Sequence, residues 1–391
     1  MHHTAVQFGA GNIGRGFIAQ LFHESGFDVV FVDVAPDVVD ALNAEGAYTI
    51  RIVGPDACDV PIRGVRAING RNLEAVAREL SSCAVASTAV GASALPHIAP
   101  AIAAGLVERR QRGNGPLNVM VCENLHGAGR YLRGLVATHL PPGERDAILA
   151  DAGFVQAVVS RMVPIQVPAG SAGAALLEVR VESYRQLPVD ATAIAGALPP
   201  IDGVRPVTNF GAYEARKLFA HNCGHATLGY LGHLRGLAYG YEALADSRIG
   251  GHLREVLAAT GEALVRRFDM DPDDHRKHVE DLLRRFANVD LGDTCYRLAR
   301  DPIRKLAPDD RLVGAARLCQ SQDVDPTAVA DVIGAAYRFA AEEDPAAVEL
   351  QRRIVDEGLE AAMVAVSGIE PGEPLASQVR AAYDAAARHG A

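Results

Sequence analysis

VQFGAGNIGRGF, residues 6–17, places three glycines directly after a short apolar run. Gly9, Gly11 and Gly14 have the spacing G-x-G-x-x-G, and helical sequence follows them. Between a strand and a helix, this pattern allows a tight turn, close approach of a pyrophosphate to the backbone, and close helix–strand packing. Free N–H groups at the helix start then face the phosphates. The predicted cofactor contacts in this turn are Gly9, Ala10, Gly11, Asn12, Ile13 and Gly14.

An acidic residue ends the second predicted strand. Asp33 stands nineteen residues after Gly14, where a carboxylate can accept hydrogen bonds from the adenine ribose hydroxyls. The same charge repels a 2′-phosphate, so the sequence favours NAD over NADP. The alternative is a tight turn and a strand-end aspartate without any ligand.

Strands and helices alternate through the first half of the chain. Valine-rich runs at 4–8, 28–34, 83–88 and 117–124 predict buried parallel strands, and helical stretches separate them. This is the pattern of an α/β, Rossmann-type doubly wound sheet. We expect the strand-like sequence at 154–183 to extend that sheet. Ligands bind at the carboxyl ends of such strands, so Thr88 and Val90 are predicted near the cofactor ribose.

The second half of the chain has a different residue pattern. Glycine and proline are dense at 196–211, and almost everything beyond reads as helix. We therefore predict an NAD-binding domain over 1–199 and an all-helical substrate domain over 200–391.

Composition limits the possible classes of protein. A net charge of -10 argues against general nucleic-acid binding. No apolar run approaches the ~20 residues needed to span a bilayer, and no leader pattern precedes the first strand. The six cysteines are scattered, which fits reduced thiols, and no Cys/His/carboxylate cluster has zinc-like spacing. We expect a cytoplasmic protein with no membrane or nucleic-acid partner and no metal.

A second group of polar residues lies in RKLFAHNCGH, residues 216–225. On a regular helix Lys217, Asn222 and His225 fall within an arc of roughly 140°, so they can share one wall of a site. A cation, an amide and an imidazole suit alcohol–carbonyl chemistry, which must move a proton and stabilise an oxygen. His221, one turn after Lys217, is a rival that spacing does not exclude. A solvated polar stripe is the simpler interpretation.

Several segments together resemble the polyol-specific long-chain dehydrogenase family. They are FGAGNIGRGF, VCEN, GALP, RKLFAHNCGHATLGYLG and RKLAPDDRL, in the order in which that family has them. The flanking segments resemble its sugar-phosphate branch. The resemblance implies a lysine base without metal, with Lys217 in that role, Asn222 and His225 beside the substrate, and Asn124 as a second oxygen-binding amide. It also implies NAD-dependent interconversion of D-mannitol 1-phosphate and D-fructose 6-phosphate, and hints at a monomer.

A phosphorylated substrate needs a local cationic pocket in this acidic chain. The best candidate is DPIRKLAPDDRL, residues 301–312, with Arg304, Lys305 and Arg311. Arginine holds phosphate through paired donors, and lysine adds a point charge. An exposed mixture of charges with the neighbouring aspartates would look the same.

Two other functions stay open. One is a dehydrogenase or reductase for an unphosphorylated polyol or a hexuronate. The other is a non-catalytic NAD-binding sensor, which would have no need of a proton acceptor such as Lys217.

Overall fold

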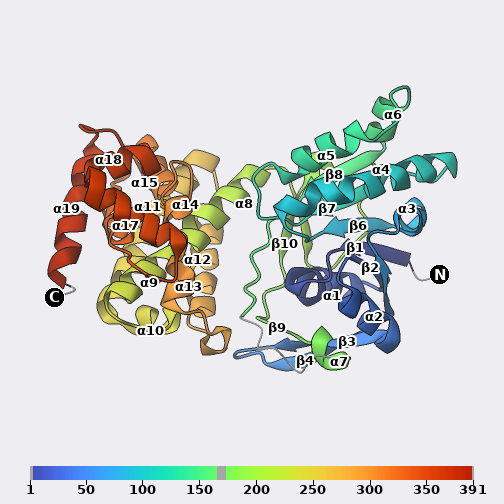
Figure 1. The fold of residues 1–391 in the computed structure, drawn as a ribbon, viewed down its shortest axis with the longest axis horizontal. Coiled ribbons are helices and arrows are strands. Elements are labelled where there is room, and N and C mark those ends of the chain that lie inside the picture. The colour runs from blue at the N-terminus through green and yellow to red at the C-terminus, as the bar shows by residue number, and fades with distance from the viewer. Residues whose placement is uncertain (1–2, 165–172, 390–391) are drawn as a thin grey trace. The chain divides into compact units, whose positions relative to one another are not determined.

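The computed structural model describes residues 3–164 and 173–389. The chain forms two compact units, one up to Phe210 and the other from Gly211 onward (Figure 1). Each unit has its own hydrophobic core and is described by itself.

A six-stranded parallel sheet is the centre of the first unit. Its strand order is β5-β2-β1-β6-β7-β8. The strands are β1 (His3–Phe8), β2 (Phe27–Asp33), β5 (Val65–Asn69), β6 (Val85–Thr88), β7 (Leu117–Val121) and β8 (Ala152–Gln156). From the central β1, the chain builds outward first to one side and later to the other, as in Rossmann-type sheets. The predicted fold class is confirmed.

Helices cover both faces of this sheet, which is why its strands are apolar on both sides (Figure 1). Alternate strand residues face opposite cores: Val29 and Phe31 belong to one, Val30 and Val32 to the other. One core includes η1 (Gly14–Ile18), α1 (Ala19–Glu24) and α2 (Pro36–Glu45). The other includes α3 (Leu73–Ser82), α4 (Leu95–Gln111), α5 (Ala128–Thr138) and α6 (Arg145–Ala150).

Two small sheets differ from the sequence prediction. The strands β3 (Ala47–Ile52), β4 (Cys58–Arg63) and β9 (Val179–Val181) form one, and β10 (Leu187–Asp190) pairs with β11 (Val204–Val207) in the other. Of the predicted group at 154–183, only β8 extends the main sheet. Val179 and Val181 of β9 instead pack against Gly16, where an added Cβ would lie 2.7 Å and 2.8 Å from their side chains. Residues 165–167 of that predicted group lie outside the described part of the chain.

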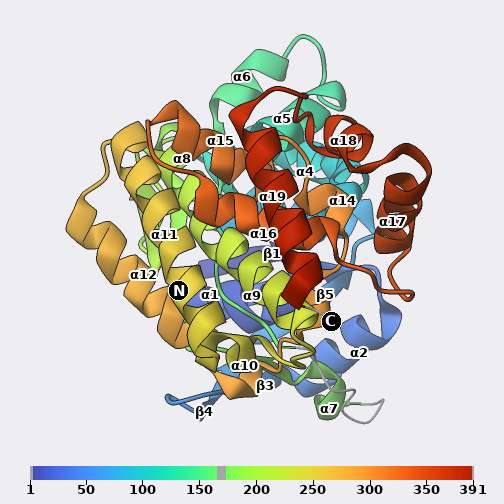
Figure 2. The same cartoon turned by 90° about the vertical axis from the view of Figure 1, so that its left-hand side faces the viewer.

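Helices build the second unit, and α9 packs against α11 and α16 (Figure 2), and also against α13. Aspartate side chains cap several of them: Asp246 accepts from Arg248 N–H at 3.0 Å, and Asp271 from Asp273 N–H at 2.8 Å. The helices are α8 (Phe210–Arg216), η4 (Lys217–Asn222), α9 (Cys223–Leu234), α10 (Gly240–Ala245), α11 (Ser247–Phe268), α12 (Pro272–Phe286), α13 (Cys295–Ala299), α14 (Pro302–Lys305), α15 (Val313–Ser321), α16 (Thr327–Tyr337), α17 (Pro345–Glu357), α18 (Leu359–Ala362), η6 (Met363–Ser367) and α19 (Pro374–His389). Across the described ranges, no helix combines the length and the apolar character needed to cross a membrane.

Candidate active site

The glycine turn follows β1 and begins η1. Gly9 has φ +88°, and a Cβ there would clash with Ala89 O. A Cβ on Gly14 would clash with Gly9 O, so both glycines are required by the packing of the turn itself. A Cβ on Gly11 would meet nothing within 4 Å. Open space therefore borders the backbone at the glycine predicted to approach a pyrophosphate, and the turn fits a dinucleotide.

Asp33 ties the end of β2 to this turn. Its Oδ2 accepts a hydrogen bond from Ala10 N–H at 2.6 Å, and its Oδ1 accepts one from Ala35 N–H at 3.0 Å. The carboxylate thus lies beside the glycine turn, and its contact with the ribose stays a prediction. Asp33 also holds the glycine turn against the end of β2 through these hydrogen bonds, which the sequence did not reveal.

The turn after β6 lies next to the glycine turn. A Cβ on Gly9 would be 3.1 Å from the Val90 side chain, and Gln7 joins the two strands by accepting from Ser87 Oγ at 2.5 Å. Thr88 is fully buried, and its hydroxyl has no hydrogen-bond partner among the described residues. The predicted cofactor residues Thr88 and Val90 are therefore brought together with the glycine turn.

Glu123 holds the turn after β6 and was missed by the sequence analysis. Its Oε1 accepts from Val90 N–H at 2.9 Å and its Oε2 from Gly91 N–H at 2.8 Å. Asn124, the predicted oxygen-binding amide, follows Glu123 beyond the end of β7 and is exposed. The only signal for Glu123 was its place in VCEN, beside that asparagine.

Lys217 begins a π turn between α8 and α9. The turn spans Lys217–Asn222, and its i→i+5 hydrogen bonding places residues five apart one above the other. Lys217 and Asn222 are therefore closer to alignment than a regular helix allows. Burial, and then the charge of Arg311, lower the pKa of Lys217 to about 8, while Glu214 opposes the shift.

Two histidines pack together on the same helix. The rings of His221 and His225 are 4.8 Å apart in an edge-to-face arrangement, and Phe286 lies 4.3 Å from the His225 ring. Burial lowers the pKa of His225 to about 3 and that of His221 well below its usual value. Both imidazoles are therefore neutral near pH 7. His221 is only 5% exposed, which makes it the less accessible of the two rivals, Lys217 and His221.

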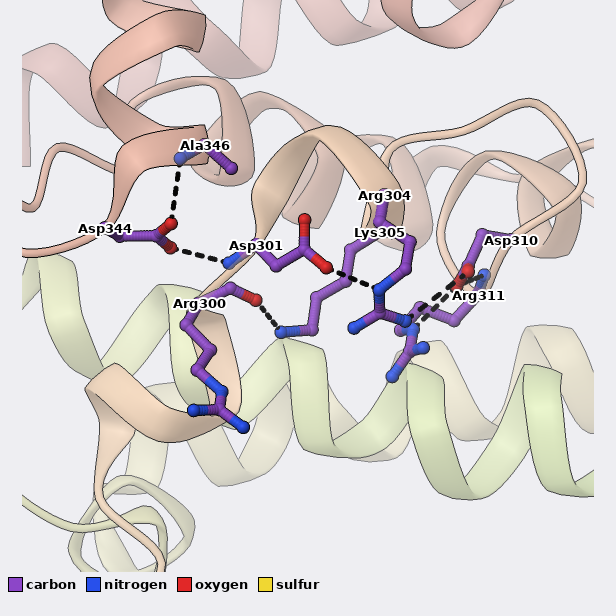
Figure 3. Close-up of polar contacts among 8 residues, drawn as sticks. All are labelled: Arg300, Asp301, Arg304, Lys305, Asp310, Arg311, Asp344 and Ala346. Carbon is purple, nitrogen blue, oxygen red and sulfur yellow. Dashed lines mark hydrogen bonds and ion pairs between the residues drawn. The ribbon is translucent and has the colours of Figure 1, made fainter. Parts of the chain in front are cut away.

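The predicted phosphate residues lie on and after α14 (Figure 3). Arg304 Nε donates to Asp301 at 2.5 Å, and Arg311 Nε donates to Asp310 at 2.7 Å. Lys305, only 4% exposed, donates to the carbonyl of Arg300, and its burial lowers its pKa to about 7. Each cation thus has an acceptor in the protein, and the aspartates of the segment orient its arginines.

These cations act on the helix that carries Lys217. The charge of Arg311 contributes to the lowered pKa of Lys217. After burial, the pKa of His225 is lowered further by the charges of four cations: Arg285, Arg311, Arg297 and Lys305. Packing supports the proximity: a Cβ on Gly314 would lie 3.0 Å from the ring of Phe219, within the π turn. Lys217, His225, Lys305 and Arg311 therefore share one cationic neighbourhood of the second unit. Arg285 and Arg297 were not singled out by the sequence.

The described residues can also be compared with the arrangements that bind metal ions. Among residues 3–164 and 173–389, no group of three or more histidine, cysteine or acidic side chains is arranged to hold a metal ion. All six cysteines are free thiols, and only Cys58 is exposed.

Comparison with known sequences identifies the family. Residues 3–203 match the family described as mannitol dehydrogenase Rossmann domain, and residues 209–387 match the mannitol dehydrogenase C-terminal domain. A mannitol-1-phosphate 5-dehydrogenase of Brevibacillus brevis is 39% identical over 376 residues, which cover 96% of this chain and 96% of that one. The chain belongs to the mannitol dehydrogenase family. It is an NAD-dependent oxidoreductase, as the sequence predicted.

Two solved structures resemble the whole chain in fold. The mannitol 2-dehydrogenase of Pseudomonas fluorescens, in a ternary complex with NAD and D-mannitol, has a TM-score of 0.76 at 18% identity, over 100% of this chain and 93% of that one. A D-sorbitol dehydrogenase in substrate-free form has a TM-score of 0.81 at 17% identity, over 100% and 94% of the two chains. The predicted resemblance to the polyol-specific dehydrogenases is thereby confirmed at the level of family and fold.

Proposed function

We propose that this member of the family interconverts D-mannitol 1-phosphate and D-fructose 6-phosphate with NAD. The observation that carries the proposal is the cationic neighbourhood of Lys217 and His225, to which Arg311 contributes in both cases. A sugar phosphate brings close to two negative charges, and a chain of net charge -10 needs such a local site to hold it. The name of the Brevibacillus brevis relative agrees with this substrate.

Lys217 is the proposed proton acceptor in the oxidation. With a pKa of about 8, its amine is neutral in a large fraction of molecules at weakly alkaline pH and can take the hydroxyl proton. When bound, NAD would supply the acceptor for the hydride that leaves the carbon bearing this hydroxyl, so the products are the ketone, NADH and a proton. Proton transfer to Lys217 requires no metal ion.

Amide and imidazole groups are proposed to hold the reacting oxygen. Asn222 lies one π turn beyond Lys217, and His225 follows it on α9. They would stabilise the oxygen as it gains negative charge. Donors of this kind are each worth roughly 3 kcal/mol at the transition state.

The phosphate is assigned to Arg304, Lys305 and Arg311. Asp310 accepts from both the backbone N–H of Arg311, at 2.6 Å, and its Nε, at 2.7 Å, so this guanidinium is fixed before any ligand arrives. Arg304 is half exposed, and its Nη1 lies 3.9 Å from Oδ2 of Asp310, the residue that also fixes Arg311 (Figure 3). Two oriented guanidinium groups and a buried lysine suit a phosphate dianion.

The test is a panel of phosphorylated and free sugars and polyols, followed by NADH absorbance. Arg304→Ala and Arg311→Ala should each raise KM for mannitol 1-phosphate about tenfold or more, with little change in KM for NAD. Arg352→Ala is the matched control, because Arg352 is an exposed arginine of the same unit paired only with surface acids.

Three outcomes contradict the proposal. Preference for an unphosphorylated polyol or a hexuronate would agree with the proposed reaction type but contradict the proposed substrate. No turnover with any member of the panel would favour an NAD-binding sensor. Equal losses for phosphorylated and free sugars in both variants would mean that these arginines hold the fold.

A further inference from the structure

An arginine directly follows the last glycine of the turn. Arg15 is only 6% exposed, and its Nε and Nη1 have no hydrogen-bond partner among the described residues. Burial lowers the pKa of this guanidinium, which means that its charge is poorly compensated. Buried charges in proteins are normally paired or fully hydrogen-bonded, so we expect an anion to bind beside an arginine in this state.

A second buried arginine, Arg161, lies beside the same helix and differs from Arg15 in its hydrogen bonds. Arg161 is 4% exposed, and its Nη1 donates to Gly16 O at 2.8 Å and to Gln20 Oε1 at 2.6 Å. Its Nε donates to Glu182 O at 2.7 Å. This part of the fold therefore provides acceptors for Nε and Nη1 of Arg161, while the same two atoms of Arg15 have none in the described chain.

The backbone of Arg15 is fixed in the first turn of the helix. Its N–H donates to Gly11 O at 2.9 Å, and its carbonyl accepts from the Tyr48 hydroxyl at 2.7 Å. Side chains on a helix lean toward the N-terminus, which here is the end formed by the glycine turn. Asp33, whose carboxylate bonds to Ala10 in that turn, is the acid whose charge acts on Arg15.

We propose that Arg15 is the counter-charge for the pyrophosphate of the bound dinucleotide. The inference rests on the proposed cofactor role of the turn from Gly9 to Gly14. A pyrophosphate lying at the open side of Gly11 brings two negative charges to the N-terminal end of the helix. Arginine forms short, charge-assisted hydrogen bonds to such oxygens. The ligand compensates the guanidinium, and the ligand-free protein bears the cost of burying it.

The test compares nucleotides with and without phosphates, in the absence of sugar. Isothermal titration calorimetry gives the Kd of NAD, ADP and adenosine for the wild type, Arg15→Met and Arg15→Lys. Arg15→Met should weaken NAD and ADP about ten- to a hundredfold and leave adenosine nearly unchanged. Arg15→Lys keeps the charge and should keep most of the preference for ADP over adenosine.

Stability of the ligand-free protein gives a second, independent readout. Arg15→Met removes an uncompensated buried charge, so its Tm without ligand should equal or exceed that of the wild type, while the rise in Tm caused by NAD should shrink. Arg161→Met is the control: it should lower the Tm of the ligand-free protein and weaken ADP and adenosine alike.

Two results would overturn the proposal. They are equal losses of affinity for ADP and adenosine in Arg15→Met, and an Arg15→Met protein that is destabilised or fails to fold. Because no sugar is present, a failure of the proposed substrate leaves these readouts unaffected.

Discussion

Replacing Arg311 with methionine should raise the pKa of Lys217. That pKa stands at about 8 rather than 10.5, which corresponds to about 3 kcal/mol against the charged amine. Burial is the larger cause and Arg311 the second, so removal of Arg311 should raise the pKa of Lys217 by roughly one pH unit, to roughly 9. Oxidation requires the neutral amine. At pH 8 the neutral fraction then falls about fivefold.

The assay is the pH profile of kcat/KM for polyol oxidation at saturating NAD, since this parameter reports groups of the enzyme before the polyol binds. The rising limb should move to higher pH in Arg311→Met and stay in place in Arg311→Lys. Arg304→Met is the matched control, because Arg304 belongs to the same cluster but is not among the charges that act on Lys217. An unmoved limb in Arg311→Met, or an equal displacement in Arg304→Met, would refute the reasoning.

Four further outcomes are expected. Lys217→Ala should lower kcat by orders of magnitude while calorimetry still detects NAD binding, and His221→Ala should do much less; the reverse pattern would move the proton acceptor to His221. Asp33→Asn should narrow the ratio of kcat/KM between NAD and NADP by removing the charge that repels a 2′-phosphate, and a wild type that uses both cofactors equally would contradict this role. Glu123→Gln should weaken NAD binding about tenfold, because an amide accepts from only one of two N–H groups, and an unchanged Kd would mean that the β6 turn tolerates the loss. Activity should survive EDTA, whereas activity that is lost and returns with zinc would overturn the lysine mechanism.

The main sheet could be predicted because its strands are apolar on both faces. Parallel strands covered by helices have no polar side, so valine-rich runs mark them directly. The strand β4 gives no such signal, because most of its residues are exposed and Pro61 interrupts it. The three residues of β9 are too short a run to show which sheet they join. The strand β9 is held by pairing with β3, a distant part of the chain, whereas β4 pairs with β3 as the next strand along the sequence.

The site was predictable where one segment carries its residues. Lys217, Asn222 and His225 are close in sequence, and helical spacing brought them together in the prediction. The π turn changes that spacing and depends on packing, which the sequence pattern does not reveal. The electrostatic link between Arg311 and Lys217 joins residues far apart in the chain. The same holds for Glu123, whose partners Val90 and Gly91 belong to another turn.

The segment that carries Arg304 is anchored by the far end of the helical unit. Asp301, with φ +62°, donates its N–H to Asp344 at 2.6 Å, and Asp344 also caps α17 through Ala346 N–H at 3.0 Å (Figure 3). One carboxylate thus joins the start of a late helix to a loop forty-three residues earlier. A change at Asp344 should therefore alter the position of Asp301, the acceptor of Arg304 Nε, without any contact with Arg304 itself. A redesign of substrate preference has to treat residues 301–311 and the start of α17 as a single module.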